Sequence, residues 1–280
     1  MKITEESFPR LVSVRGQRGL SDDVGWCGPF NGREEATRAI EAIYEVTQIR
    51  QCSPRITLNS MKSASPCALF DMKKCGAPCV GKESVDTYAS HVMTTRVSLH
   101  HDATAILNSI NQRMKELAEQ ERFEEAAELR NRLSSFIRGT ARGQRIRSLT
   151  RVPHLIAALP LSPQLWEFAV IRFGRLAGTA QGTSTNYKDV IESLTLTADV
   201  VVDNGEILPA SHHEEVEVLL RYLSQDGIRL VDIDGEWSLP TFGSGSARQN
   251  LERVREASDS LRYKEDFANS FVRSAQRSTN

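Results

Sequence analysis

The chain has 280 residues, 40% of them hydrophobic and 25% charged, with a formal net charge of −1. This composition predicts two modest folded domains, and no apolar run is long enough to predict a membrane span. A near-neutral charge excludes capture of nucleic acid by the molecule as a whole, so contact with DNA would need a local basic patch. The first residues, MKITEESFPR, lack the apolar stretch of a secretory signal, and we expect a cytoplasmic protein.

The first fifty residues predict one short strand and one helix. The sequence LVSVR at 11–15 is typical of a strand. Asn31, with Glu34 three residues later, is a capping signal, and apolar residues then recur at helical spacing to about Gln48.

Four of the five cysteines fall in one irregular segment, at Cys52, Cys67, Cys75 and Cys79. A reducing compartment disfavours disulfides, and four thiolates suit either a zinc ion or a cubane iron–sulfur cluster. The spacings x14, x7 and x3 contain only one knuckle-like pair, which disfavours a zinc ribbon. Gly76, Pro78 and Gly81 favour an open turn whose amides approach cluster sulfurs. Ordinary buried thiols are the alternative.

Between Gly81 and Gly139 the chain contains neither glycine nor proline, which predicts helices joined by short turns. Ser84 is a candidate cap for the first of them. Two later apolar stripes flank the polar turn EQER and predict an antiparallel hairpin. The second stripe supplies the candidate partner-binding residues Phe123, Ala126, Ala127, Leu129 and Arg130. A lone hairpin cannot bury both stripes, so either this chain or a partner protein must cover them.

The hairpin continues into a basic stretch that has no acidic residue. Its arginines are Arg138, Arg142, Arg145, Arg147 and Arg151. They form a candidate surface for DNA phosphates, and the alternative is a solvated helix end.

From about residue 150 the pattern changes to a period of two, which predicts strands. The expected strands are 154–161, 164–173, 175–182, 198–204 and 228–234, with helices at 186–194, at 211–225 and from Ser246 onward. The whole chain is therefore expected to be α+β, with a helical N-terminal region and a smaller mixed α/β domain beginning near Leu149.

Two further groups of polar residues are interpreted as structural. Asp232, Asp234 and Glu236 surround an Asp-Gly pair that predicts a tight turn rather than a metal site. The histidine pairs at 100–101 and 212–213 have no metal-ligand partner at useful spacing, and we expect them on the surface.

The order of the motifs FPRL, GPF, IRQC, PCALFDMKKCGAPCVG and LAEQERFEEAAELRNRL resembles the UvrC family, the excinuclease subunit of bacterial nucleotide excision repair. The resemblance implies that Cys52, Cys67, Cys75 and Cys79 hold a [4Fe-4S] cluster. It also implies that 123–130 belong to a UVR motif, a hairpin that pairs with a hairpin of UvrB. Related actinobacterial proteins fuse such a region to an exonuclease domain.

The resemblance divides the chain into five parts. They are 1–30, the end of a GIY-YIG-type domain or linker; 31–82, the helix and cysteine region; 83–149, helical, with the UVR-like hairpin at about 104–138; 150–245, similar to the segment before the ribonuclease-H-like half; and 246–280, a helix and tail. The residues of both UvrC nuclease centres are expected to lie outside this sequence.

The expected function is therefore a UvrC-like scaffold, not catalytic as this chain alone, that links a UvrB-type helicase, DNA and an upstream nuclease or exonuclease domain. One alternative is an active excinuclease subunit. The other is a nucleic-acid-binding protein stabilised by zinc in place of the iron–sulfur cluster.

Overall fold

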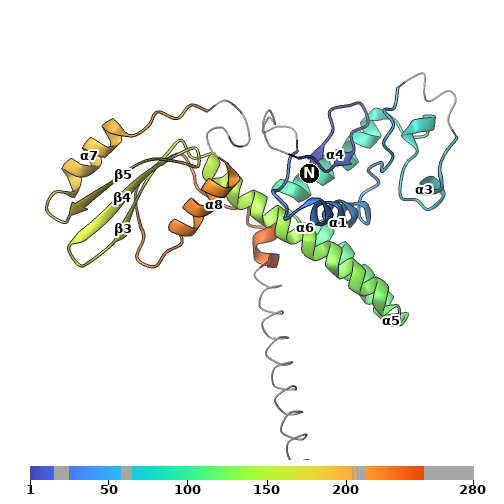
Figure 1. Ribbon diagram of the computed structural model, residues 1–280. Helices are drawn as coiled ribbons and strands as arrows, with labels where there is room; N and C mark the ends of the chain where they lie inside the picture. The colour runs from blue at the N-terminus through green and yellow to red at the C-terminus, as the bar shows by residue number, and fades with distance from the viewer. Residues whose placement is uncertain (16–24, 58–64, 204, 206–207, 209–211, 249–280) are drawn as a thin grey trace, which may run out of the picture.

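The computed structural model describes residues 1–15, 25–57, 65–203, 205, 208 and 212–248. Within these ranges the chain forms a helical N-terminal lobe and a second lobe built on an antiparallel sheet, and the long helix α6 (Phe123–Thr150) runs from one to the other (Figure 1). The α+β class expected from the sequence is confirmed. None of the helices in these ranges combines the length and apolar character that a membrane crossing requires.

Short strands and helices enclose the core of the N-terminal lobe. In chain order they are β1 (Lys2–Ile3), β2 (Leu11–Val12), α1 (Arg33–Tyr44), α3 (Ala68–Asp71), the 3-10 turn η2 (Pro78–Val80), α4 (Val85–His100) and α5 (Thr104–Glu119). The hydroxyl of Ser84 accepts a hydrogen bond from the Thr87 amide at 3.1 Å, so the expected cap of α4 is confirmed. The expected cap at Asn31 is wrong, because α1 follows Gly32 without a side-chain cap and the Asn31 amide donates to Glu35.

Helices α5 and α6 form the predicted hairpin, and the chain itself buries most of its apolar stripes. Ile106, Ile110 and Leu117 of α5 are almost fully buried. On α6, Leu129 and Leu133 join the same core, into which α1 also packs. Other parts of this chain therefore cover the base of the hairpin. Of the two expected ways to bury the stripes, packing within the chain applies there.

The second lobe contains a four-stranded sheet in the order β5-β4-β3-β6, with every neighbouring pair antiparallel. Its elements are β3 (His154–Pro160), β4 (Leu165–Arg172), β5 (Arg175–Thr183), α7 (Tyr187–Thr197), α8 (His213–Tyr222) and β6 (Arg229–Asp234). Strand β3 is buried on both faces, because Ile156 belongs to the core beneath α7 and Leu155 to the core beneath α8 and the end of α6. Ile146 and Leu149 of α6 lie in that second core, so the expected boundary near Leu149 falls inside a shared helix.

The expected strand at 198–204 does not form in its described part, 198–203. Val200 and Val202 are 86% and 71% exposed. The guanidinium of Arg172 binds the carbonyls of Thr195, Ala198 and Asp199, so this segment closes α7 instead of joining the sheet. The helix expected from Ser246 is seen at 244–248, and the rest of that expectation lies outside the described residues.

Two glycines let the segment 28–30 pack directly against α6. A Cβ atom on Gly139 would lie 1.9 Å from a ring carbon of Phe30, and one on Gly143 would lie 2.8 Å from the Gly28 carbonyl oxygen. The two glycines are four residues apart and therefore share one helix face. This contact fixes the loop before α1 against the helix that joins the lobes.

We expect Gly139→Ala to destabilise the protein. Alanine normally favours a helix by about 1 kcal/mol over glycine, but overpacking against Phe30 should outweigh this and leave a net loss of about 1–3 kcal/mol. The measurement is the urea unfolding midpoint. Gly245→Ala is the matched control, since its Cβ meets no atom within 4 Å. A Gly139→Ala midpoint at or above the wild-type value would contradict the close packing.

Candidate cluster site and hairpin surface

The four clustered cysteines line one small enclosed cavity in the N-terminal lobe. They come from the loop after α1, the residue before α3, the loop after α3, and η2. Ile56, Leu69 and Phe70 add an apolar wall. The structure thus brings together all four predicted ligands, while Cys27 lies apart in the core, where burial raises the pKa of its thiol to about 12.

Left-handed backbone on both sides of η2 folds the segment around the last two cysteines into a tight turn. Ala77, between these cysteines, has φ 57°, and Gly81, after the second, has φ 71°. Gly76 is needed for a different reason, because a Cβ there would lie 2.2 Å from a carboxylate oxygen of the buried Glu83. Both glycines that the sequence singled out therefore have a defined steric role.

Burial and mutual proximity disfavour free thiolates in this cavity. Burial raises the pKa of Cys75 first, and the neighbouring Cys52, Cys67 and Cys79 raise it further. The pKa of Cys79 is raised by burial and then by Cys52 and Cys67. No three of the four sulfur atoms lie within 4.8 Å of one another, although all four residues are described.

Arg50 holds the cysteine loop against the N-terminal strands, and the sequence analysis did not single it out. Its side chain is fully buried. The guanidinium donates to the Phe8 carbonyl at 2.7 Å, to the Cys52 carbonyl at 2.8 Å and to the Pro54 carbonyl at 2.8 Å. It also pairs with the Glu6 carboxylate at 2.8 Å and lies 3.4 Å from the Cys52 sulfur. The available signal was an arginine two residues before a cysteine of the predicted cluster.

The backbone of Arg50 extends this network to α4. Its amide donates to the Tyr88 hydroxyl at 2.8 Å, and that hydroxyl donates to the Pro9 carbonyl at 2.6 Å. Tyr88 is fully buried, and burial raises the pKa of its phenol. One arginine and one tyrosine thus connect three segments that are distant in sequence.

The exposed part of the hairpin lies near its turn. Phe123 is 64% exposed and borders an open groove that Ala126, Ala127 and Arg130 also line, with Met114 from α5. Leu129 does not belong to this surface, because it faces the core and is 4% exposed. Phe123, Ala126, Ala127 and Arg130 therefore share one face of the hairpin. The prediction is wrong for Leu129, because a buried side chain cannot contact a partner.

The predicted basic stretch divides into two helix faces. Arg138, Arg142 and Arg145 line one pocket, whereas Arg147 and Arg151 do not line it. Nine residues separate 138 from 147 and 142 from 151, a rotation of roughly 180° around the helix. On the opposite face, the charge of Arg147 lowers the pKa of Cys27 against the larger effect of burial. The stretch is not one continuous phosphate-tracking surface.

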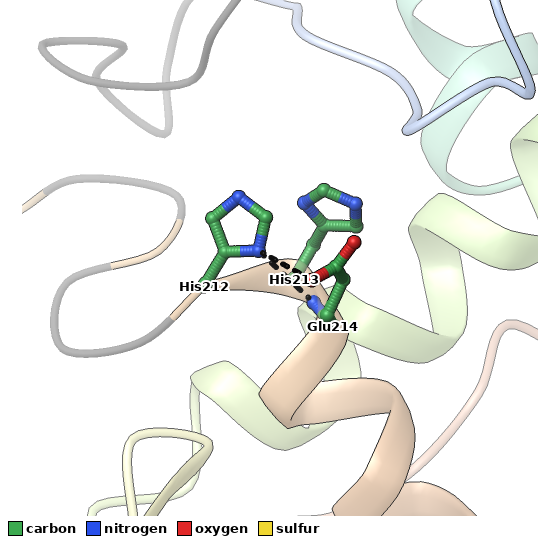
Figure 2. A group of neighbouring side chains, drawn as sticks. All are labelled: His212, His213 and Glu214. Atoms are coloured by element: carbon green, nitrogen blue, oxygen red, sulfur yellow. Dashed lines mark hydrogen bonds and ion pairs between the residues drawn. The ribbon is translucent and has the colours of Figure 1, made fainter.

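The remaining polar clusters are placed as follows. Asp232 and Asp234 are exposed on β6, and Gly235 after them has φ 87°, as a turn requires. His212 and His213 begin α8, and their ligand atoms lie within 4.8 Å of those of Glu214 (Figure 2). The expectation that this histidine pair lacks a neighbouring ligand was therefore wrong, and the run HHE was the signal. The His212 ring also caps the Glu214 amide at 3.5 Å, which is a structural role.

The comparisons with known proteins agree with this arrangement. Residues 1–98 match the UvrC/Cho excinuclease middle domain, and residues 104–136 match the UvrB/UvrC motif, UVR. The chain is thus a UvrC-like protein, in which a UvrC middle domain precedes a UVR hairpin.

Its relatives are longer proteins. A Mycobacterium tuberculosis protein named as a bifunctional exonuclease/endonuclease is 30% identical over 237 residues, 84% of this chain and 36% of that protein. The UvrABC system protein C of Rickettsia prowazekii is 33% identical over 132 residues, 47% of this chain and 20% of that protein. The chain therefore spans well under half of these relatives. The longer alignment extends past residue 136 into the second lobe. No solved structure matches the chain.

We expect Arg50→Lys to destabilise the chain by about 3 kcal/mol, because one ammonium cannot serve all the acceptors and leaves buried groups unpaired. Urea unfolding measures the change. Arg96→Lys, at an exposed position on α4, should stay within about 0.5 kcal/mol of wild type. Equal effects of the two substitutions would show that Arg50 does not organise the loop.

Proposed function

We propose that the chain acts in nucleotide excision repair as a UvrC-like scaffold. It holds an iron–sulfur cluster, binds a UvrB-type partner through the α5–α6 hairpin, contacts DNA, and does not cut DNA by itself. The observation that carries the proposal is the succession of a UvrC middle domain, whose four cysteines line one cavity, and a UVR hairpin with an exposed Phe123. The similarity to UvrABC system protein C supports the excision-repair role. The absence of cutting by this chain alone rests on the expectation that the nuclease residues of the family lie outside this sequence.

The cavity fits a [4Fe-4S] cluster better than a zinc ion. Tetrahedral zinc with four thiolates at about 2.3 Å would place the sulfur atoms roughly 3.8 Å apart. Here no three sulfur atoms come within 4.8 Å of one another. A cubane binds each thiolate at a different iron, so its ligands stand farther apart, and the donor set of four cysteines is the one such clusters use. Bound there, the group would join α3, η2 and the loop after α1.

The groove beside Phe123 fits a second helical hairpin. Ala126 and Ala127, which line the groove beside the exposed Phe123, have short side chains that do not project past its ring. The ring can therefore insert into a groove of a partner without a steric clash. At the base of the hairpin, Arg132 pairs with Glu41 of α1 at 3.1 Å and with Glu45, just after α1, at 3.0 Å. These ion pairs connect the hairpin to the segment at the end of α1, although exposed pairs of this kind contribute only about 0–1 kcal/mol each.

Two other functions have specific tests. An active excinuclease subunit would make a specific incision in lesion-bearing duplex together with a UvrB-type partner. If that incision disappears in Asp232→Asn with Asp234→Asn, the acidic residues of β6 are catalytic and the scaffold proposal fails. A zinc-stabilised nucleic-acid-binding protein would contain stoichiometric zinc.

Anaerobically purified protein should be brown and should contain iron and acid-labile sulfide in nearly equal amounts. Cys75→Ser with Cys79→Ser should lose both, because the two thiolates come from one turn of the cavity. Cys27→Ala is the control and should keep the iron, since Cys27 does not line the cavity. Zinc in place of iron in the wild-type protein would favour the zinc alternative.

Phe123→Ala should weaken binding to a UvrB-type partner by about 2 kcal/mol or more, which is roughly thirtyfold. Titration calorimetry measures the affinity, and circular dichroism verifies that the hairpin is folded. Leu196→Ala removes another exposed apolar side chain, in the second lobe, and should leave the affinity unchanged. Equal affinity of Phe123→Ala and wild type would assign the hairpin to intramolecular packing alone.

A further inference from the structure

A pocket rich in arginine lies where the two lobes meet. Its volume is about 320 Å³, and its walls come from the segment before α1 and its first turn, from α6, from α8 and from the helical residues 244–248. Its charged residues are Arg138, Arg142, Arg145, Arg221, Arg248, Glu35 and Glu217. Five guanidinium groups face two carboxylates, so the pocket carries an excess of positive charge. We call it the α6–α8 pocket.

Two of the arginines are held by acidic side chains and form a fixed wall. Arg142 makes two hydrogen bonds with the Glu217 carboxylate, one of them 2.7 Å long, and a third with the Asn31 side chain at 3.1 Å. These bonds raise the pKa of Arg142 and lower that of Glu217. Arg138 pairs with Glu35 at 2.9 Å. Neither guanidinium can turn to a ligand without leaving its partner.

Arg145 and Arg221 are differently placed. Each lies about one helical turn beyond the Arg142–Glu217 pair, on α6 and on α8 respectively. Neither makes a side-chain hydrogen bond or ion pair within the described ranges, and the positive charge of Arg221 contributes only at longer range to the lowered pKa of Glu217. Two guanidinium groups that no carboxylate of the described residues pairs with therefore line a pocket that has more arginines than acidic residues.

This arrangement suits a phosphate. The planar fork of arginine matches two phosphate oxygens, and a concave site with fixed walls strengthens the attraction between the charges. The glycine contacts at 139 and 143 hold the segment 28–30 against α6, so this wall does not have to be ordered on binding.

We infer that the α6–α8 pocket binds a backbone phosphate of DNA through Arg145 and Arg221. The inference rests on the proposed function, in which the chain contacts DNA. It assigns that contact to one face of α6 together with α8, and it excludes Arg147 and Arg151 from it.

The test measures binding of a fluorescein-labelled duplex oligonucleotide to the complete chain, without a partner protein, by anisotropy over a series of salt concentrations. The variants are Arg145→Gln with Arg221→Gln, and, as the control, Arg151→Gln, which removes an arginine charge directly after α6 and outside the pocket. We expect the double variant to bind about tenfold more weakly, from the loss of charge-assisted hydrogen bonds. The slope of log K against log salt should flatten by about 0.9, the value for one phosphate. Urea unfolding verifies that both variants are folded.

The outcomes separate the inference from the proposed function. Weaker binding confined to the double variant supports the pocket. Equal losses in the double variant and Arg151→Gln, or no loss in either, overturn the pocket but leave DNA binding intact. No binding by wild-type protein at low salt overturns both the pocket and the DNA contact of the proposed function. Inorganic phosphate is the second probe: if it raises the melting temperature of wild type but not of the double variant, while both bind DNA equally, the pocket holds a free anion and the inference fails.

Discussion

The buried guanidinium of Arg50 is the interaction on which the N-terminal lobe depends. The loop that carries Cys52 has no regular secondary structure, so its carbonyl groups need donors from elsewhere. Arg50 supplies these donors to the loop and to Phe8, and Glu6 balances its charge. Burying a charge is unfavourable unless it is paired and hydrogen-bonded, and here the guanidinium pairs with Glu6 and donates to three backbone carbonyls. The cysteine cavity therefore has one preformed wall before any metal or cluster binds.

The second constraint is the length of α6. Its 28 residues extend over roughly 42 Å and reach from the exposed hairpin turn to the core of the second lobe. One helix therefore contributes residues to the hairpin groove, to the arginine pocket and to the core beneath the sheet.

The second lobe has a supporting role in this arrangement. Its sheet is covered by α7 on one face and by α8 with the end of α6 on the other. Helix α8 contributes Glu217 and Arg221 to the pocket, so the sheet positions half of the charged site through α8. The acidic residues of β6 lie at the sheet edge, away from that site, as exposed residues of a strand that ends in a turn.

The sequence by itself determined the local features of this protein. Periodicity identified the hairpin and all four strands of the sheet, Ser84 identified a helix start, and cysteine clustering identified four thiols that share one cavity. Only the tertiary structure decided which side chains of those elements remain accessible. Leu129 and Phe123 have similar local patterns, yet α1 covers one and not the other; Val200 and Val202 favour a strand but have no sheet to join. Arg50 and Arg221 acquire their roles from residues far away in sequence. Periodicity records which face of an element is apolar, whereas burial, charge pairing and pocket formation depend on the neighbours that the fold supplies.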